Sequence, residues 1–163
     1  MKYFYILTIV ISILSISCNN QPPAINEADR EKLKTSFYET LELHLKAVSN
    51  RDLSTLKSTM SPKGNMELIL PGTEIISTVD SFLTFHEKWF QEANWTFETK
   101  ILQTDIGHEI GTAIVESMYR ELDRNGQPYF NRMHISYVLK RIDNRWYLVQ
   151  DHASSVEKST DKK

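Results

Sequence analysis

The sequence has few of the residues that stabilise or charge specialised proteins. Its 163 residues include a single cysteine, which excludes a disulfide framework and a cysteine-rich zinc site. Neither sign of charge dominates, since 19 lysines and arginines stand against 21 aspartates and glutamates, so nothing indicates a protein that follows nucleic-acid phosphates. Glycine and proline occur five times each, too rarely for a low-complexity chain. What remains is an ordinary globular composition, 40% hydrophobic, in a chain long enough for one domain with its own core.

The most continuous apolar run lies at the start of the chain. After Lys2, residues 4–16 are apolar apart from one threonine and two serines, and Ser17 and Cys18 follow directly. A basic start, a short apolar stretch and a small residue before a cleavage point describe a secretory signal. The run is also shorter than the roughly 20 residues that cross a bilayer as a helix.

The position of the lone cysteine resembles a bacterial lipoprotein signal, although Ser15 stands where that signal usually has an apolar residue. The resemblance implies that residues 1–17 are removed and that Cys18 becomes the lipidated first residue. Residues 18–25, which are polar and stiffened by two prolines, then form a tether. The expected location is the cell envelope, on the periplasmic or outer side of a bacterial membrane. A secreted protein without a lipid and a signal anchor are the alternatives.

Beyond the tether, helical periodicity comes first and strand periodicity second. Apolar residues recur every three or four positions within residues 33–48, 53–60 and 82–90, which predicts three helices. Asn26 and Asp52 stand where they can cap the first two helices. Two short strands are predicted near residues 66–70 and 73–78. Four longer segments then alternate with a period of two: 95–104, 109–122, 129–141 and 145–154.

Turn signals separate the long strands, and Asn125-Gly126 is the clearest because these residues accept the positive φ angles of a tight hairpin. The pattern predicts an α+β fold in which three N-terminal helices pack on a curved antiparallel sheet. We assign one domain to residues 26–156 and a frayed polar tail to residues 157–163, with fraying expected from Val156 onward.

Several segments of this body resemble known families. Residues 47–53 are similar to the helix junction of the nuclear transport factor 2-like superfamily, which includes SnoaL-like proteins. The second half resembles the association (hub) domain of calcium/calmodulin-dependent protein kinase. The residues that carry this second resemblance are Phe85–Phe90, Asp123–Gly126, Pro128, Asp143–Trp146, Val149, His152 and Ser154. The resemblance implies a cone-shaped fold, a strongly bent sheet around the long first helix, with a pocket at its open end and frequent dimers through the sheet.

Alternation of side chains divides the last three strands into two faces, because neighbours in a strand point to opposite sides. The odd-numbered face carries Ala113, Val115, Tyr119, Ile135, Tyr137, Leu139, Val149 and Asp151. The even-numbered face carries Ile110, Ile114, Met118, His134, Val138, Trp146, Leu148 and His152. Both faces are partly apolar, so one must meet the helices and the other a partner. We expect a homodimer across the even face.

The hub resemblance places the odd face inside the pocket. With the helical phase of the third helix, it predicts that His86, Trp89, Tyr119, Tyr137 and Asp151 line one cavity. Each residue also has a plain structural interpretation. His86 can be a satisfied core histidine, the two tyrosines can be packed rings, and Asp151 can lie near the mouth or pair with an arginine.

The hub pocket binds small carboxylates with one histidine and several arginines. His86 matches that histidine, but the arginine positions correspond to Ser117, Tyr137 and Ala153. Carboxylate binding therefore does not carry over, and a small neutral or apolar ligand is expected instead. The other four histidines show no metal-ligand spacing, so we expect neither a metal nor a cofactor.

Two functions follow from these residues. The first is a non-catalytic, membrane-anchored envelope module that forms dimers and holds a small molecule. The second is a small-molecule isomerase, dehydratase or hydrolase that uses Asp151 or His86 as general base. The superfamily contains both kinds of protein, so the fold alone does not choose between them.

The anchor prediction is tested by cell fractionation of the natural chain beside Cys18→Ser. We expect the natural protein in the membrane fraction and the variant, which lacks the lipidated thiol, in the soluble fraction or as uncleaved precursor. Equal amounts of both proteins in the soluble fraction would contradict the lipoprotein interpretation.

Overall fold

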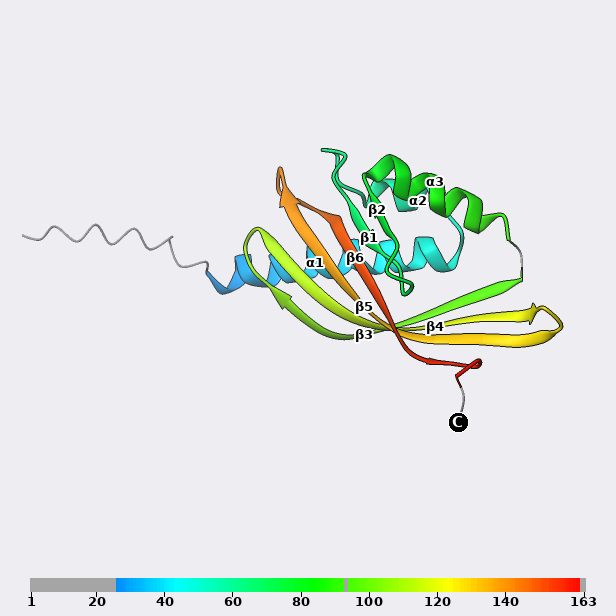
Figure 1. The fold of residues 1–163 in the computed structure, drawn as a ribbon. Helices are drawn as coiled ribbons and strands as arrows, with labels where there is room; N and C mark the ends of the chain where they lie inside the picture. Colours follow the sequence, from blue (N-terminus) through cyan, green and yellow to red (C-terminus); the bar gives the residue numbers. More distant parts are fainter. Residues whose placement is uncertain (1–25, 93, 162–163) are drawn as a thin grey trace, which may run out of the picture.

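The computed structural model describes residues 26–92 and 94–161, so the predicted signal, Cys18 and the tether lie outside the described part (Figure 1). The elements, in chain order, are α1 (Glu27–Ser49), α2 (Leu53–Ser58), β1 (Glu67–Ile69), β2 (Ile75–Ser77), α3 (Val79–Phe90), β3 (Trp95–Ile106), β4 (Ile110–Arg124), β5 (Gln127–Ile142) and β6 (Arg145–Lys158). Within residues 26–92 and 94–161, no helix is long and apolar enough to span a membrane.

The strands form a single six-stranded sheet in the order β2-β1-β6-β5-β4-β3. The predicted α+β fold, with helices on a curved sheet, is confirmed. The sheet is not entirely antiparallel, however, because β1 pairs with β6 in parallel. A parallel pair needs a long crossover connection, and here α3 and three long strands lie between the two partners in the sequence.

The long first helix supplies much of the core. Its buried side chains recur at helical spacing, as the sequence predicts, and include Phe37 and Leu41, which are fully buried. Phe37 packs directly on the backbone of β4, where a Cβ on Gly111 would lie 2.5 Å from the ring. Glycine at this position therefore allows the helix to approach the sheet closely.

The local signals for helix starts and turns are confirmed. The Asn26 side chain accepts a hydrogen bond from the Asp29 amide at 2.8 Å, and Asp52 accepts one from the Thr55 amide at 2.9 Å. Asn125 and Gly126 both have positive φ, at 58° and 83°, in the β4–β5 turn. Asparagine and aspartate are favoured at helix N-caps, and Asn-Gly is favoured where a tight hairpin needs positive φ angles.

The inner face of β4 and β5 consists of odd-numbered residues, as predicted, but β6 departs from this rule. Leu148 pairs with Leu139 and Gln150 pairs with Val138, so β6 contains one extra residue, Val149, at a bulge. Before the bulge the even-numbered residues face inward. The placement of Trp146 and Leu148 on the outer face is therefore wrong: they are 3% and 0% exposed and belong to the core.

The C-terminal boundary also needs correction. Fraying was expected from Val156, with a tail from residue 157, but β6 continues to Lys158, and the Ser159 amide donates a hydrogen bond to the Phe130 carbonyl at 3.1 Å. This pairing depends on a strand that is distant in sequence, so the polar composition of the segment does not reveal it.

Figure 1 shows how the helices lie against the sheet. α1 runs alongside the bent sheet, and α2 and α3 lie near the C-terminal end of α1. Ser49, the last residue of α1, donates a hydrogen bond to the Phe97 carbonyl of β3 at 2.7 Å. Near the other end of the helix, the Trp146 indole donates to the Leu33 carbonyl at 3.3 Å.

Candidate functional site

A cavity of about 360 Å³ lies between the inner face of the sheet, α3 and the C-terminal end of α1. Its walls are mainly apolar and include Val48, Leu68, Leu70, Pro71, Phe85, Trp89, Phe97, Met133, Ile135 and Ala153. A volume of this size is ordinary for a small-molecule site. Four buried polar residues line it: His86, Tyr137 and Asp151 at its inner end and Asn131, the cross-strand partner of Tyr119. A more exposed set that includes Glu121 and Arg124 borders its mouth.

All five residues singled out in the sequence line this cavity. α3 contributes His86 and Trp89, and the other three lie on adjacent strands: Tyr119 on β4, Tyr137 on β5 and Asp151 on β6. Tyr137 and Asp151 are direct cross-strand partners, so their side chains emerge side by side on the inner face. Their role in binding or catalysis stays a prediction.

Asp151 is a buried carboxylate in apolar surroundings. It is 7% exposed, and Oδ1 has no hydrogen-bond partner among the described residues. No arginine or lysine of the described part pairs with it. The interpretation that Asp151 lies near the mouth or pairs with an arginine is therefore wrong. Burial raises the pKa of the Asp151 carboxyl from its ordinary value to about 7, because the charged form loses its hydration. The group can therefore gain or lose a proton near neutral pH.

His86 is neutral, and its tautomer is defined. Nδ1 lies 2.9 Å from the Phe82 carbonyl oxygen, which can only accept, so Nδ1 carries the proton and Nε2 keeps its lone pair. Burial lowers the pKa of His86 to about 4. The imidazole also packs on the Phe82 ring at 4.0 Å between centroids. His86 thus combines both interpretations, a packed core histidine that also offers a hydrogen-bond acceptor on the cavity wall.

A second buried histidine, His44 of α1, lies behind Tyr137, with 5.7 Å between ring centroids. The Thr59 hydroxyl donates to the Leu56 carbonyl and accepts from His44 Nδ1 at 2.9 Å, which leaves Nε2 unprotonated and without a described partner. Burial, together with the nearby His86, lowers the pKa of His44 to about 3. Sequence spacing did not single out this residue.

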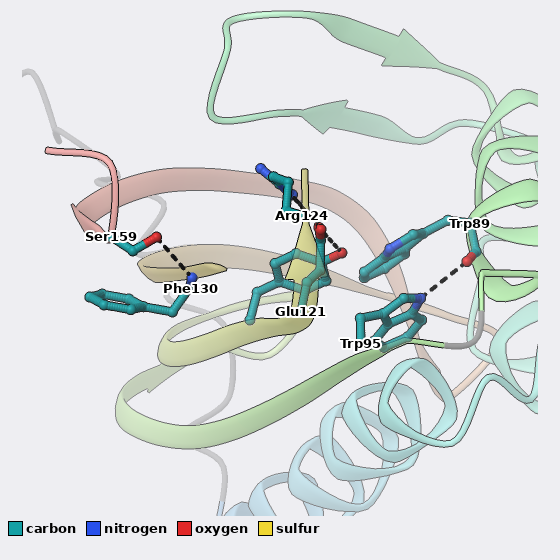
Figure 2. Close-up of polar contacts among 7 residues, drawn as sticks. Trp89, Trp95, Glu121, Arg124, Phe130 and Ser159 are labelled. Atoms are coloured by element: carbon teal, nitrogen blue, oxygen red, sulfur yellow. Dashed lines mark hydrogen bonds and ion pairs between the residues drawn. The ribbon is translucent and has the colours of Figure 1, made fainter. Parts of the chain in front are cut away.

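The mouth of the cavity carries a hydrogen-bonded group that the sequence did not predict. The Tyr119 hydroxyl donates to Glu121 at 2.6 Å, and Arg124 holds the same carboxylate through Nε at 2.8 Å and through Nη2 (Figure 2). The Arg124 guanidinium also lies over the Tyr129 ring, 3.4 Å from its centroid. Burial and the bond to Glu121 raise the pKa of Tyr119 to about 12, so it remains protonated. An irregularity of register between Glu121 and Arg124 accompanies this arrangement.

This group includes an arginine at the pocket. The sequence places no arginine at the hub positions, but it does not reveal Arg124, which borders the pocket from a different position. Glu121 nevertheless engages the edge formed by Nε and Nη2, so the charge of Arg124 is already compensated and an incoming carboxylate would meet the Glu121 carboxylate beside it. At the hub arginine positions, Ser117 and Ala153 are small, buried inner-face residues.

Trp89 is held in place by a stack of side chains. Its indole lies on that of Trp95, with 4.3 Å between centroids and 13° between planes, and Trp95 Nε1 donates to the Trp89 carbonyl at 3.2 Å (Figure 2). Arg51 covers the Trp95 ring at 3.9 Å and donates to the Trp95 carbonyl. The cavity wall formed by Trp89 is therefore rigid, with a cation–π contact at its back.

No group of three or more histidine, cysteine, aspartate or glutamate side chains in residues 26–92 and 94–161 is placed to hold a metal ion.

Comparison with known proteins agrees with this architecture. Residues 38–157 match the model of the SnoaL-like domain. Among solved structures, a type 2 hexachlorocyclohexane dehydrochlorinase (LinA) is similar with a TM-score of 0.71 and 12% identity, over 82% of this chain and 92% of that one. A putative dehydratase of the NTF2-like family from Streptomyces avermitilis has a TM-score of 0.65 and 14% identity, over 77% of this chain and 97% of that one.

The association domain of CaMKII from C. elegans is also similar, with a TM-score of 0.58 and 22% identity, over 79% of this chain and 99% of that one. At these identities the solved structures establish the fold and nothing further. The curated proteins contain no sequence match to the chain. The family model spans most of the chain and the structural neighbours share its sheet and helices, so the protein belongs to the SnoaL-like domain family and has the NTF2-like fold.

Proposed function

We propose that this protein is a membrane-anchored envelope module whose SnoaL-like domain binds a small neutral or weakly polar molecule. The observation that carries the proposal is the convergence of His86, Trp89, Tyr119, Tyr137 and Asp151 on one mainly apolar cavity. Such a cavity offers area for an apolar body and a few polar groups that orient it.

The charges around the cavity favour a ligand that is not an anion. Asp151 and the mouth residues Glu92 and Glu121 are acidic, and Arg124 is engaged by Glu121. A small carboxylate would meet two or three like charges, and the one guanidinium at the mouth is already paired with a carboxylate. The Tyr137 hydroxyl and the lone pair of His86 Nε2 suit a ligand with an uncharged donor or acceptor.

A second candidate function is supported by Asp151. A buried carboxylate with a pKa of about 7, beside a tyrosine hydroxyl in an apolar cavity, has the properties of a general base. In an isomerase or dehydratase, Asp151 would remove a proton from carbon, and Tyr137 would donate a hydrogen bond to the developing oxyanion. His86 cannot donate from Nε2 in the observed tautomer, and its lowered pKa makes it the weaker base.

The anchor proposal rests on Cys18, which lies outside the described residues, and it fits the position of the cavity. α1 has 23 residues and is therefore about 34 Å long at 1.5 Å per residue. The cavity borders Val48, near the C-terminal end of α1, whereas the tether joins the other end. A lipid at Cys18 would leave the cavity mouth at the end of the domain distant from the anchor.

The dimer proposal rests on the outer face of β4 and β5. With Trp146 and Leu148 in the core, the apolar residues left on this face are Ile110, Ile114, Met118 and Val138. Ile110 is 53% exposed. Ile110, Ile114 and Val138 are diagonal neighbours across the two strands, whereas Met118 lies beyond Glu116, which is paired with Arg132. This patch is smaller than the sequence predicted, but it is a reasonable surface for a second copy of the chain.

The binding proposal is tested with 4-phenylbutan-1-ol, a neutral probe with an apolar body, against the full chain in a non-ionic detergent. We expect measurable binding that weakens about fivefold in Tyr137→Phe, because one hydrogen bond to the ligand is lost. His86→Ala should weaken binding at least as much, because it also removes part of the wall. Lys57→Ala, on α2 and outside the cavity lining, is the matched control and should change nothing. Stronger binding of 4-phenylbutanoate than of the alcohol would contradict the proposal.

The catalytic alternative predicts deuterium exchange into 4-phenylbutan-2-one at the carbons next to the carbonyl, followed by NMR. The base must be ionised, so the rate should rise as the pH increases through about 7 and then level off. Asp151→Asn should lower the rate by about a hundredfold or more. A protein that binds the ketone without accelerating exchange at pH 8 is not an enzyme of this type.

The dimer proposal predicts that light scattering gives the mass of two chains for the natural protein and of one chain for Val138→Glu, with an unchanged melting temperature. A carboxylate at the centre of that face would be buried without a partner in the dimer. Leu148→Glu is the contrasting variant: because Leu148 is 0% exposed within one chain, this substitution should unfold the domain. A single-chain mass for the natural protein at micromolar concentration would rule out the dimer.

A further inference from the structure

The cavity has an inner end that combines one carboxylate with aromatic walls. Six aromatic side chains line the cavity as a whole, from the inner end to the mouth: Phe85, Trp89, Phe97, Tyr119, Tyr129 and Tyr137. Trp89 is fixed by its stack on Trp95, and Tyr137 is the direct cross-strand neighbour of Asp151. Aromatic faces carry partial negative charge and attract cations, most strongly where water is excluded.

The carboxylate has no counter-charge within the described residues. From β5 it faces Tyr137, whose pKa lies well above its usual value because of burial and the nearby Asp151. From β1 its neighbour is Leu68, and α3 contributes the neutral His86 to the same cavity. From α1 the neutral His44 stands behind Tyr137. None of these groups is a cation at neutral pH.

The charges at the mouth do not compensate for Asp151 either. Glu92 and Glu121 are acidic, and Arg124, the cation among the described lining residues, is paired with Glu121 and covers the Tyr129 ring. An ionised Asp151 is therefore a buried charge without a partner, a situation that costs several kcal/mol unless a cation enters.

We propose that this cavity binds an organic amine in its protonated form, with the ammonium group against Asp151 and the apolar body against the aromatic walls. A primary ammonium carries three donors. Asp151 offers carboxylate oxygens, of which Oδ1 has no described partner, and His86 offers the Nε2 lone pair on the same cavity wall. The remaining polar surface of the ammonium can lie over the ring of Tyr137 or Trp89.

This inference goes beyond the proposed function, because a neutral ligand uses the same walls but leaves the carboxylate uncompensated. An amine compensates it, and the acidic mouth attracts a cation where it would repel an anion. The two proposals share the cavity, so the experiment compares ligands that have the same body and different charge.

The test measures binding of 4-phenylbutylamine, 4-phenylbutan-1-ol and 4-phenylbutanoate to the full chain in one non-ionic detergent, by titration calorimetry. At pH 8 we expect the amine to bind at least tenfold more tightly than the alcohol, and the carboxylate to bind more weakly than both. Asp151→Asn should bring amine binding down to the level of alcohol binding, and the alcohol binding that this variant retains shows that the cavity is intact. Glu87→Gln, a change of the same kind at an exposed position of α3 outside the cavity lining, is the control and should leave amine binding unchanged.

The pH dependence gives a readout that needs no variant. Because the amine requires ionised Asp151, its affinity should fall roughly tenfold from pH 8 to pH 6, across a pKa of about 7, while that of the alcohol changes little. The amine itself stays protonated over this range. His86 and His44, with pKa values of about 4 and 3, do not titrate there.

The outcomes separate the two proposals. Equal affinity for amine and alcohol at pH 8, or amine binding that is unchanged in Asp151→Asn, would overturn the amine inference while leaving the proposed neutral-ligand function in place. Tighter amine binding that is lost in the mouth variant Glu92→Gln instead of in Asp151→Asn would also overturn it, by placing the cation at the mouth. No binding of any of the three probes to the natural chain would overturn both proposals.

Discussion

A single extra residue in β6 decides which of its side chains reach the interior. At Val149 the strand advances by two positions while β5 advances by one, so the even-numbered Trp146 and Leu148 and the odd-numbered Asp151 all face inward. Without this bulge, a strand that buries Leu148 would turn Asp151 toward solvent. The hydrophobic core and the polar end of the cavity can share one strand only because the alternation changes phase between them. Further register shifts in β3, after Ile101, and near the end of β6 accompany the bending of the open sheet.

The bulge also separates the features that the sequence predicts from those that it does not. Helix starts at Asn26 and Asp52 and the turn at Asn125-Gly126 were predictable, because each depends on a side chain acting on its own backbone. The inner faces of β4 and β5 were predictable because their alternation is unbroken over the core. The bulge in β6 was not, since its residues carry no local signal and its existence is fixed by pairing with β5. The two misplaced side chains, Trp146 and Leu148, are those on the far side of that bulge.

The candidate site was also predictable only in part. The five predicted lining residues follow from alternation, from helical phase and from the family resemblance. Glu121 and Arg124 were missed because their position at the mouth depends on an irregular hairpin, and His44 was missed because a histidine within an apolar helical stripe looks like any other polar interruption. Of the electrostatic properties, the raised pKa of Asp151 follows from a carboxyl placed among apolar residues, but the tautomer of His86 could not be predicted. The neutrality of His86 results from burial, which outweighs the opposite effect of the Phe82 carbonyl, and this carbonyl fixes the tautomer. The high pKa of Asp151 results from burial in a fold that brings no cation of the described residues beside it.

The stacking of Trp89 on Trp95 has an optical consequence. Two indoles that lie 4.3 Å apart and almost parallel couple electronically, so their circular dichroism reports the stack as a pair. The third tryptophan of the chain, Trp146, lies near the opposite end of α1, edge-on to Phe37 and bonded to Leu33. The chain thus carries one intrinsic chromophore pair at the cavity wall and a separate chromophore in the distant core. The circular dichroism of the tryptophans can therefore distinguish a change at the cavity from a change in the whole fold, without any added label.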